Sequence, residues 1–169
     1  MPALFIGRFQ PFHKGHLAAI KWILKKERKI FIVIGSNQRF LTKDNPFSFT
    51  ERKKIIKGAF KKEKVKNFKI FGAHDYHNDI FWSKKVLRIT KSDPKTIKIF
   101  TMNPWTRECF KKIGVKTKPH PIFCNNLSGT KIREKMNEDK RWEGLVPRAA
   151  FSFLKEINCE KRIKLLNKC

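Results

Sequence analysis

Residues 3–35 read ALFIGRFQPFHKGHLAAIKWILKKERKIFIVIG, which is two apolar runs separated by a polar loop and a periodic segment. The runs Ala3–Gly7 and Lys29–Gly35 have the length and the β-branched and aromatic content of buried strands. Between them, the apolar residues of His16–Glu27 recur at helical spacing. A crossover of this length joins parallel strands in a right-handed sense. The stretch therefore predicts a βαβ unit at the beginning of the chain.

The alternation of strand and helix patterns continues along the chain. Ser48 and Glu51 have the spacing of a capping box, which predicts a helix from Ser48 to about Lys62. Further strands are expected at 67–71, 96–101 and 115–118, and further helices at 81–89, 104–113, 128–137, 147–157 and 160–166. We expect an α/β fold, a doubly wound parallel sheet with a helical C-terminal end over residues 128–169. The length of 169 residues suits a single domain, residues 1–169.

The chain carries a formal net charge of +26, from 40 Lys and Arg residues against 14 Asp and Glu residues. Such a charge predicts nonspecific attraction to nucleic acids at low salt. The lysines are spread over nearly every segment, whereas a dedicated nucleic-acid site concentrates charge on one face. The alternatives are a lysine-rich surface without a dedicated role and a field that collects phosphorylated substrates. Neither a membrane span nor a signal peptide is expected, so we predict a cytoplasmic protein.

The cysteine and histidine spacings do not indicate a metal site. The four cysteines, none of which is in a C-x-x-C pair, are Cys109, Cys124, Cys159 and Cys169. We expect free thiols and neither a zinc ribbon nor a redox dithiol. His74 and His77 are close enough in sequence for a metal pair, but no third ligand accompanies them.

The loop after the first strand contains a candidate phosphate site, because ligands of open parallel sheets bind beyond the carboxyl ends of the strands. Gly15 lets phosphate approach the backbone, and His16 begins a helix whose N-terminal amides favour anions. The imidazoles of His13 and His16 can donate to phosphate oxygens as negative charge shifts during transfer. The structural alternative is two ordinary histidines, one of which caps the helix. The preceding strand and the neighbouring Arg8 and Gln10 favour the phosphate site.

A second candidate phosphate site is the segment Leu127–Arg133, which reads LSGTKIR. Ser128 suits an N-cap, which by itself is a structural role. Thr130 and Arg133 are three residues apart and therefore share a face of the helix that begins there. A hydroxyl, the free helix amides and a guanidinium would then surround one anion.

Together, GRFQPFHKGH at residues 7–16 and SGTKIR at residues 128–133 resemble the nicotinamide-mononucleotide adenylyltransferase family in its short archaeal type. The similarity covers almost the whole chain, including Asn45–Phe47 and the ending at residues 142–166. Arg8–Gln10 distinguishes the chain from relatives that act on pantetheine phosphate, flavin mononucleotide or cytidylyl acceptors, which usually read G-T-F-D there. The resemblance implies a Rossmann-like nucleotidyltransferase fold.

The resemblance also implies transfer of AMP from ATP to nicotinamide mononucleotide (NMN), which yields NAD and pyrophosphate, with Mg²⁺ on the phosphates. The reaction would be a direct in-line displacement, since no side chain is obviously paired with a base as a covalent nucleophile. The implied catalytic residues are His13, His16 and Arg8, with His16 nearest the α-phosphate. The implied ATP-binding set is Gly7, Arg8, Phe9, Gln10, His13, Lys14, Gly15, His16, Asn103, Ser128, Thr130 and Arg133. The implied NMN-binding set is Ser36, Gln38, Asp75 and Trp82.

Three of these residues also have structural interpretations. Trp82 suits a core aromatic, Asp75 a turn and Lys14 a solvated helix start. Family members commonly have other residues at four positions that we expect on the acceptor side, namely Leu41, Asp44, Tyr76 and Asp79. Alternative functions are therefore an adenylyltransferase for another phosphorylated acceptor, such as nicotinate mononucleotide or a flavin nucleotide, and a basic RNA-binding module. Relatives of the short type also imply a homo-oligomer, often a hexamer.

Overall fold

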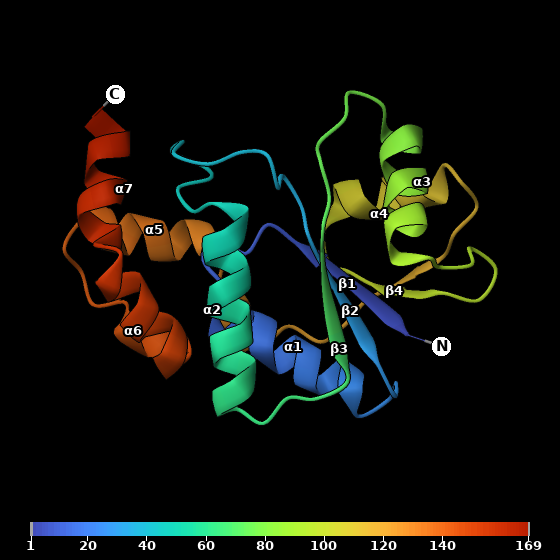
Figure 1. The fold of residues 1–169 in the computed structure, drawn as a ribbon, viewed down its shortest axis with the longest axis horizontal. Helices are drawn as coiled ribbons and strands as arrows, with labels where there is room; N and C mark the ends of the chain where they lie inside the picture. Colours follow the sequence, from blue (N-terminus) through green and yellow to red (C-terminus); the bar gives the residue numbers. More distant parts are fainter. Residues whose placement is uncertain (1, 169) are drawn as a thin grey trace. The chain divides into compact units, whose positions relative to one another are not determined.

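The computed structural model describes residues 2–168, apart from the side chain of Asn126. Five strands form one parallel sheet in the order β3-β2-β1-β4-β5 (Figure 1). The strands are β1 Ala3–Gly7, β2 Ile30–Ile34, β3 Phe68–Gly72, β4 Lys98–Phe100 and β5 Thr117–Lys118. In the register, Phe5 of β1 lies opposite Ile32 on one side and Phe100 on the other. The predicted parallel sheet is confirmed.

Helices follow the strands as the sequence pattern predicts. They are α1 Lys14–Leu24, α2 Phe49–Lys62, α3 Asp79–Thr90, α4 Pro104–Lys111, α5 Gly129–Asn137, α6 Arg148–Glu156 and α7 Cys159–Lys168, with 3-10 turns η1 Cys124–Asn126 and η2 Glu143–Leu145. The capping box of α2 is present, because the Ser48 side chain accepts from the Glu51 amide and the Glu51 side chain accepts from the Ser48 amide. The helical C-terminal end is confirmed as well.

The described chain divides into two compact units, each built from three separate segments. Unit 1 runs from the N-terminus to Gly7 and continues over Ala19–Asn37 and Asn67–Pro121, so it contains the whole sheet together with α3 and α4. Unit 2 comprises Arg8–Ala18, Gln38–Lys66 and the chain from Ile122 onward, with α2 and α5 to α7. Helix α1 begins in unit 2 and ends in unit 1. The single domain stays a prediction.

The sheet of unit 1 is covered by helices on both faces. On one face, Leu4, Val33 and Ile99 share a buried cluster with Trp82 of α3 and Phe110 of α4, as the position of these helices in Figure 1 also indicates. Successive side chains of a strand point to opposite faces. Accordingly, Phe100 of β4 points to the other face, where its ring lies edge-on to Trp22 of α1 with 5.9 Å between centroids. This is the doubly wound arrangement that the alternating pattern predicts.

In unit 2, helix α2 packs against α6, and α7 packs against α5 and α6. A part-buried ion pair joins two of these helices, since Arg162 of α7 donates to both carboxylate oxygens of Glu51 at 2.8 and 2.9 Å. The same guanidinium donates to the Pro46 carbonyl at 3.3 Å. Glu51, which completes the capping box of α2, therefore also connects α2 to α7 through its ion pair with Arg162.

No helix within residues 2–168 combines the length and the apolar character that a membrane span needs. The cysteines of the described chain, Cys109, Cys124 and Cys159, are free thiols as expected. The prediction for Cys169 lies outside the described residues.

Candidate functional site

The loop that follows β1 is anchored in unit 2 by two buried phenylalanines. Phe9 and Phe12 are 1% and 0% exposed, and their ring centroids lie 5.9 Å apart. The Phe12 ring also lies edge-on to Phe60 of α2, at 5.9 Å. Burial of an aromatic side chain contributes about 1.5–3 kcal/mol. These two anchors therefore hold the polar residues of the loop in place, and a direct contact of Phe9 with ATP stays a prediction.

Gln10 ties the same loop to the segment before α2. Its side-chain Nε2 donates to the Phe47 carbonyl at 2.9 Å, and its Oε1 accepts from the Phe47 amide at 3.0 Å. Both bonds are buried, and Gln10 is 3% exposed. The carboxamide is therefore committed to Phe47 on both its oxygen and its nitrogen. In this geometry the Gln10 side chain fixes the position of the loop relative to Phe47. Its expected contact with ATP stays a prediction.

His13 and His16 form a stacked and mutually hydrogen-bonded pair. The His13 amide donates to His16 Nδ1 and the His16 amide donates to His13 Nδ1, both at 3.3 Å. The ring centroids lie 3.6 Å apart with the planes inclined by 22°. A neutral imidazole that accepts at Nδ1 carries its proton on Nε2. Both rings are therefore set as Nε2–H donors, the form that suits contact with phosphate oxygens.

Burial fixes the charge of the first histidine. His13 is 4% exposed, and desolvation lowers its pKa to about 4. The ring is therefore neutral at pH 7 and acts there as a hydrogen-bond donor without a net charge. Gly15 makes room for it, because a Cβ on Gly15 would lie 3.1 Å from both Cε1 and Nδ1 of His13.

The second predicted motif meets the loop at the N-terminus of α5, also within unit 2. Ser128 caps the helix by accepting from the Lys131 amide at 3.2 Å. Arg133 is 8% exposed and donates through Nη1 to the Gln10 carbonyl at 2.8 Å, while its Nη2 lies 3.5 Å from Thr130 Oγ1. A Cβ on Gly129 would lie only 2.6 Å from the Gln10 oxygen. Glycine at this position therefore permits the close approach of α5 to the loop.

The charged side chains around the contact between the histidine loop and the N-terminus of α5 are mostly cations. Burial lowers the pKa of Arg133, and the positive charge of nearby Arg8 lowers it further. Arg8 and Lys14 are exposed. Asp44 Oδ1 lies 3.5 Å from Arg133 Nη2. Asp44 therefore contacts a residue of the predicted ATP set, and its expected place on the acceptor side stays a prediction.

Arg52 is a structural residue of the site that sequence reasoning did not single out. It lies on α2, is fully buried, and donates through Nη1 to the Arg8 carbonyl at 2.8 Å and through Nε to the Ser48 carbonyl at 3.3 Å. A buried cation needs such acceptors, since an unpaired one is costly. A sequence signal for its burial is the position of an arginine on the apolar face of a predicted helix, next to Ile55 and Ile56.

Three of the four predicted acceptor residues lie in unit 1. Ser36 follows β2 and donates to Asp75 Oδ1, which follows β3, at 3.0 Å. These side chains therefore meet at the carboxyl edge of the sheet, where ligands of such sheets bind. Gly7, at the same edge, accepts from the Gly35 amide at 3.0 Å. The fourth residue, Gln38, belongs to unit 2.

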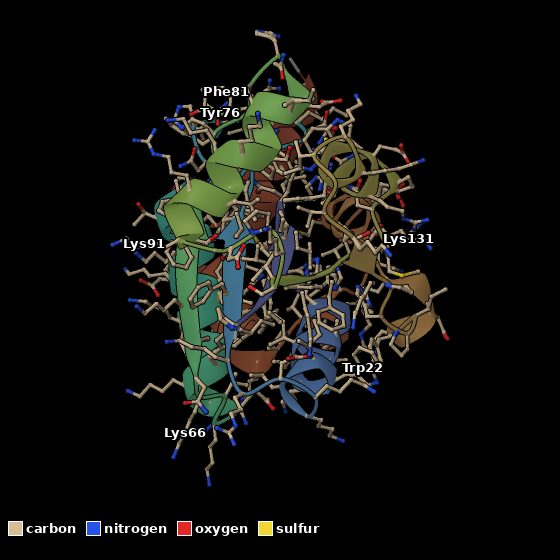
Figure 2. The ribbon with its side chains drawn as sticks, turned by 90° about the vertical axis from the view of Figure 1, so that its right-hand side faces the viewer. Trp22, Lys66, Tyr76, Phe81, Lys91 and Lys131 are labelled. Carbon is tan, nitrogen blue, oxygen red and sulfur yellow. The ribbon has the colours of Figure 1, made fainter. Side chains whose placement is uncertain are left out.

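Trp82 is a core aromatic that also borders a cavity. It is 2% exposed, and its ring packs at 4.7 Å from Trp105 and 5.8 Å from Phe110. A cavity of about 220 Å³ beside it in unit 1 is lined by Gly72, Ala73, His74, Tyr76, Trp82, Lys85, Val86 and Ile89. Figure 2 shows Tyr76 and Phe81 close together near the beginning of α3, where their rings lie edge-on at 4.8 Å. The structural interpretation of Trp82 is thus confirmed, and its stacking on a pyridine ring stays a prediction.

Three asparagines of these loops differ in how their side-chain oxygens are bonded. Asn103, a predicted ATP residue, caps α4 in unit 1 by accepting from the Thr106 amide at 3.1 Å. Within the described residues, the buried side-chain oxygens without a hydrogen-bond partner are those of Asn37 in unit 1 and Asn45 in unit 2. A buried acceptor left unpaired costs about 1–3 kcal/mol, so a donor from a ligand would offset that cost. Neither belongs to the predicted site set.

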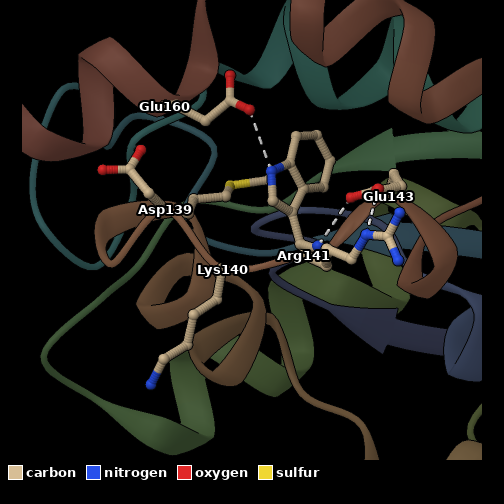
Figure 3. Close-up of a pocket in the computed structure, with 7 residues that line it drawn as sticks. Asp139, Lys140, Arg141, Glu143 and Glu160 are labelled. Atoms are coloured by element: carbon tan, nitrogen blue, oxygen red, sulfur yellow. Dashed lines mark hydrogen bonds and ion pairs between the residues drawn. The ribbon is translucent and has the colours of Figure 1, made fainter.

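A smaller pocket of about 170 Å³ in unit 2 contains none of the predicted residues (Figure 3). Its carboxylates already have partners. Glu160 accepts from Trp142 Nε1 at 3.1 Å and from Lys155, Glu143 accepts from the Trp142 amide, and Asp139 pairs with Lys164. In the part of the chain described, no group of three or more His, Cys, Asp or Glu side chains could hold a metal ion. A metal pair at His74 and His77 therefore has no third ligand among these residues.

Comparison with known proteins agrees with the two motifs. The sequence pattern of the cytidylyltransferase-like family matches residues 4–135. The nicotinamide-nucleotide adenylyltransferase of Thermococcus sibiricus is 36% identical over 169 residues, which cover 98% of this chain and 89% of the relative. The protein of the same name from Thermoplasma acidophilum is 38% identical over 167 residues, 98% of this chain and 91% of the relative.

Among solved structures, the fold is similar to that of a bifunctional NMN adenylyltransferase/ADP ribose pyrophosphatase from Francisella tularensis, crystallised with AMP and a manganese ion. The TM-score is 0.84 at 24% sequence identity. The match covers 99% of this chain but 52% of the other, so this chain spans about half the length of that bifunctional protein. At this identity the likeness concerns the fold alone.

The contact between α5 and the loop predicts a high sensitivity at Gly129. In Gly129→Ala, the added Cβ would overlap the Gln10 carbonyl, a backbone atom that cannot rotate away. We expect a loss of about 1–3 kcal/mol in the free energy of unfolding, measured by urea titration. Gly144→Ala is the matched control, since its Cβ would meet nothing within 4 Å. Equal stabilities of the two variants would contradict the close approach.

The lowered pKa of His13 predicts a pH-dependent stability. The unfolded chain binds the imidazole proton at about pH 6.5 and the folded chain at about pH 4, so the stability held by neutral His13 is present above pH 6.5 and lost as the pH falls toward 4. When the pH falls from 7 to 4.5, the free energy of unfolding should decrease in both the parent chain and His13→Gln. The decrease, measured by urea titration, should be about 2 kcal/mol smaller in His13→Gln. His77→Gln, an exposed control, should follow the parent, and parallel curves for His13→Gln would refute the assignment.

Proposed function

The chain belongs to the cytidylyltransferase-like family, and we propose that within it the protein is a nicotinamide-nucleotide adenylyltransferase, which transfers AMP from ATP to NMN and releases NAD and pyrophosphate. The observation that carries this conclusion is the meeting of two predicted phosphate segments in unit 2. Arg133 of α5 donates to the carbonyl of Gln10 in the histidine loop. The relatives with that name, 36% and 38% identical over nearly the whole chain, support the same reaction.

The reaction requires one bond to form and one to break. An oxygen of the NMN 5′-phosphate attacks the α-phosphorus of ATP, and the bond from that phosphorus to the bridging oxygen of the β-phosphate breaks, so that pyrophosphate leaves with the bonding electrons. The attacking phosphate is already a competent nucleophile. Positioning and stabilisation of the shifting negative charge can therefore supply most of the catalysis.

The side chains of unit 2 are suited to this task. The Nε2–H groups of His13 and His16, the amides at the N-terminus of α5 and the guanidinium of Arg133 are all donors, and hydrogen bonds fix both imidazoles. We assign His16 to the α-phosphate and the remaining donors to the triphosphate, including Arg8, Lys14, Ser128 and Thr130. Gly7, Phe9, Gln10 and Gly15 would shape the loop around it, and a role of Asn103 in ATP binding stays a prediction.

Covalent catalysis by the two buried thiols, Cys109 and Cys159, has little support. Burial raises the pKa of Cys109 to about 11 and that of Cys159 to about 12. Both thiols are therefore protonated at pH 7, and a protonated thiol is a poor nucleophile. This agrees with a direct displacement without a protein-bound intermediate.

For the acceptor we assign the residues at the carboxyl edge of the sheet. Ser36 and Asp75, joined by a hydrogen bond, would orient the ribose or phosphate of NMN, and a role of Gln38 in NMN binding stays a prediction. Trp82 would face the pyridine ring across the cavity at Ala73 and Tyr76. Nicotinate mononucleotide remains the alternative acceptor.

We propose that Mg²⁺ enters the site on the phosphates of ATP. The donors of the described loop and of α5 are cationic or neutral, with the Asp44 carboxylate beside them, so the protein fits a nucleotide-borne metal rather than a caged one. The ion would neutralise charge on the phosphates during transfer.

We propose the cytoplasm as the compartment of the protein, since ATP and pyridine nucleotides are the substrates of the proposed reaction. A homo-oligomer is the proposed assembly, with the hexamer of the short archaeal type as its pattern. The net charge of +26 would give nonspecific binding to nucleic acids at low salt that weakens as the salt concentration rises.

Turnover with a panel of acceptors tests the proposed function. The protein is incubated with ATP, Mg²⁺ and, in separate reactions, NMN, nicotinate mononucleotide and flavin mononucleotide, and pyrophosphate and dinucleotide are quantified by chromatography. We expect equal amounts of NAD and pyrophosphate from NMN. Absence of turnover with both pyridine nucleotides would refute the proposal, and turnover with the flavin nucleotide alone would reassign the acceptor.

The histidine pair allows a sharper test of mechanism. His16→Asn keeps a polar group near the Nδ1 position but removes the Nε2–H donor, and we expect kcat to fall about 100-fold. His16→Gln places an amide donor near the Nε2 position and should retain more activity than His16→Asn. Circular dichroism and thermal unfolding check that both variants fold. Equal activity of the two variants would remove the Nε2–H donor from the mechanism.

A further inference from the structure

Asp44 places a carboxylate against the guanidinium that the proposed function assigns to ATP. Its Oδ1 lies 3.5 Å from Nη2 of Arg133. The Asp44 side chain is 74% exposed, whereas the Arg133 side chain is 9% exposed. The carboxylate therefore lies between a mostly buried cation and the solvent.

The other contacts of Arg133 show which of its nitrogen atoms this carboxylate occupies. Nη1 donates to the Gln10 carbonyl at 2.8 Å, so that end of the guanidinium is used inside the protein. Nη2 lies 3.5 Å from both Thr130 Oγ1 and Asp44. A phosphate that binds at Nη2 must therefore displace the Asp44 carboxylate or lie beside it.

The fold of the turn does not require the Asp44 side chain. The backbones of Thr42 and Asn45 exchange hydrogen bonds at 3.1 and 3.3 Å, and the Asn45 amide also donates to Thr42 Oγ1 at 3.1 Å. The carboxylate of Asp44 is directed to Arg133 instead. Its effect is therefore electrostatic, and it can be removed without loss of a turn contact.

We propose that Asp44 makes the ATP site selective for the metal-complexed nucleotide. The repulsion between a carboxylate and a bound polyphosphate increases with the charge of the polyphosphate. A bound divalent cation removes a large part of that charge, so the complexed nucleotide is repelled less than the free one. Asp44 thus lowers the affinity for metal-free ATP more than the affinity for the metal complex. This inference rests on the proposed function, because it takes ATP as the ligand of Arg133.

Binding of ATP with and without metal tests the selectivity. Calorimetric titrations are run with the parent chain and Asp44→Asn, once in EDTA and once in excess Mg²⁺, so that the readout is affinity rather than turnover. In Asp44→Asn we expect the affinity for metal-free ATP to rise about fivefold and the affinity for the magnesium complex to rise less than about twofold. The preference for the complexed form should therefore decrease.

Two control variants separate this effect from general charge and structure. Asp139→Asn changes the net charge equally, and Asp139 is 75% exposed and paired with Lys164 in the same unit. Its titrations should match the parent. Asp44→Glu keeps the carboxylate and should keep the parent's preference for the complexed form, and thermal unfolding verifies the fold of each variant.

The outcomes that contradict the inference are distinct. An equal change of affinity with and without Mg²⁺ in Asp44→Asn would overturn the selectivity. A loss of affinity for the magnesium complex alone would make Asp44 a ligand of the metal and would also overturn it. If the parent chain binds no ATP in either condition, the proposed function itself fails, whereas the first two results leave that function intact.

Discussion

The carbonyl oxygen of Gln10 accepts a hydrogen bond at 2.8 Å from the buried guanidinium of Arg133, 123 positions further along the chain. The side chain of the same residue exchanges two buried hydrogen bonds with the backbone of Phe47. Gln10 thus connects the histidine loop, the segment before α2 and the beginning of α5. Each of these bonds is buried, and an unpaired buried polar group costs about 1–3 kcal/mol. The three segments must therefore keep their relative positions for unit 2 to remain stable.

The chemistry of unit 2 depends on this constraint. The histidines follow Gln10 by three and six residues, and their rings are fixed by each other's backbone amides. Gly129 brings the N-terminus of α5 against Gln10, so the free amides of the helix lie near the same loop. Donors that are already oriented need no reorganisation when charge shifts between phosphates, which is why preorganised donors are effective in transfer reactions. The buried hydrogen bonds that stabilise the unit also orient its donors.

The elements of the fold could be predicted because strands and helices have different periods of apolar residues. The first and second strands, the capping box of α2 and the succession of C-terminal helices all follow from such patterns. The boundaries were less well predicted. Helix α1 begins at Lys14 rather than His16, and the His13 carbonyl accepts from the Leu17 amide in its first turn. The pattern over residues 96–101 yields a strand of only Lys98–Phe100, because pairing with β1 and not propensity sets its length.

The sequence by itself determined the order of the elements, the two phosphate segments and their chemical character, because periodicity and residue type are local properties. Only the tertiary structure decided what each polar group contacts. In the folded protein the Gln10 side chain binds the backbone of Phe47, and the buried Arg52 donates to the Arg8 carbonyl. Trp82 lies in the core, and Asp44 contacts Arg133. These outcomes depend on partners tens of residues away in the sequence. Such contacts arise only when helices and loops pack and when each buried polar group must find an acceptor or a donor.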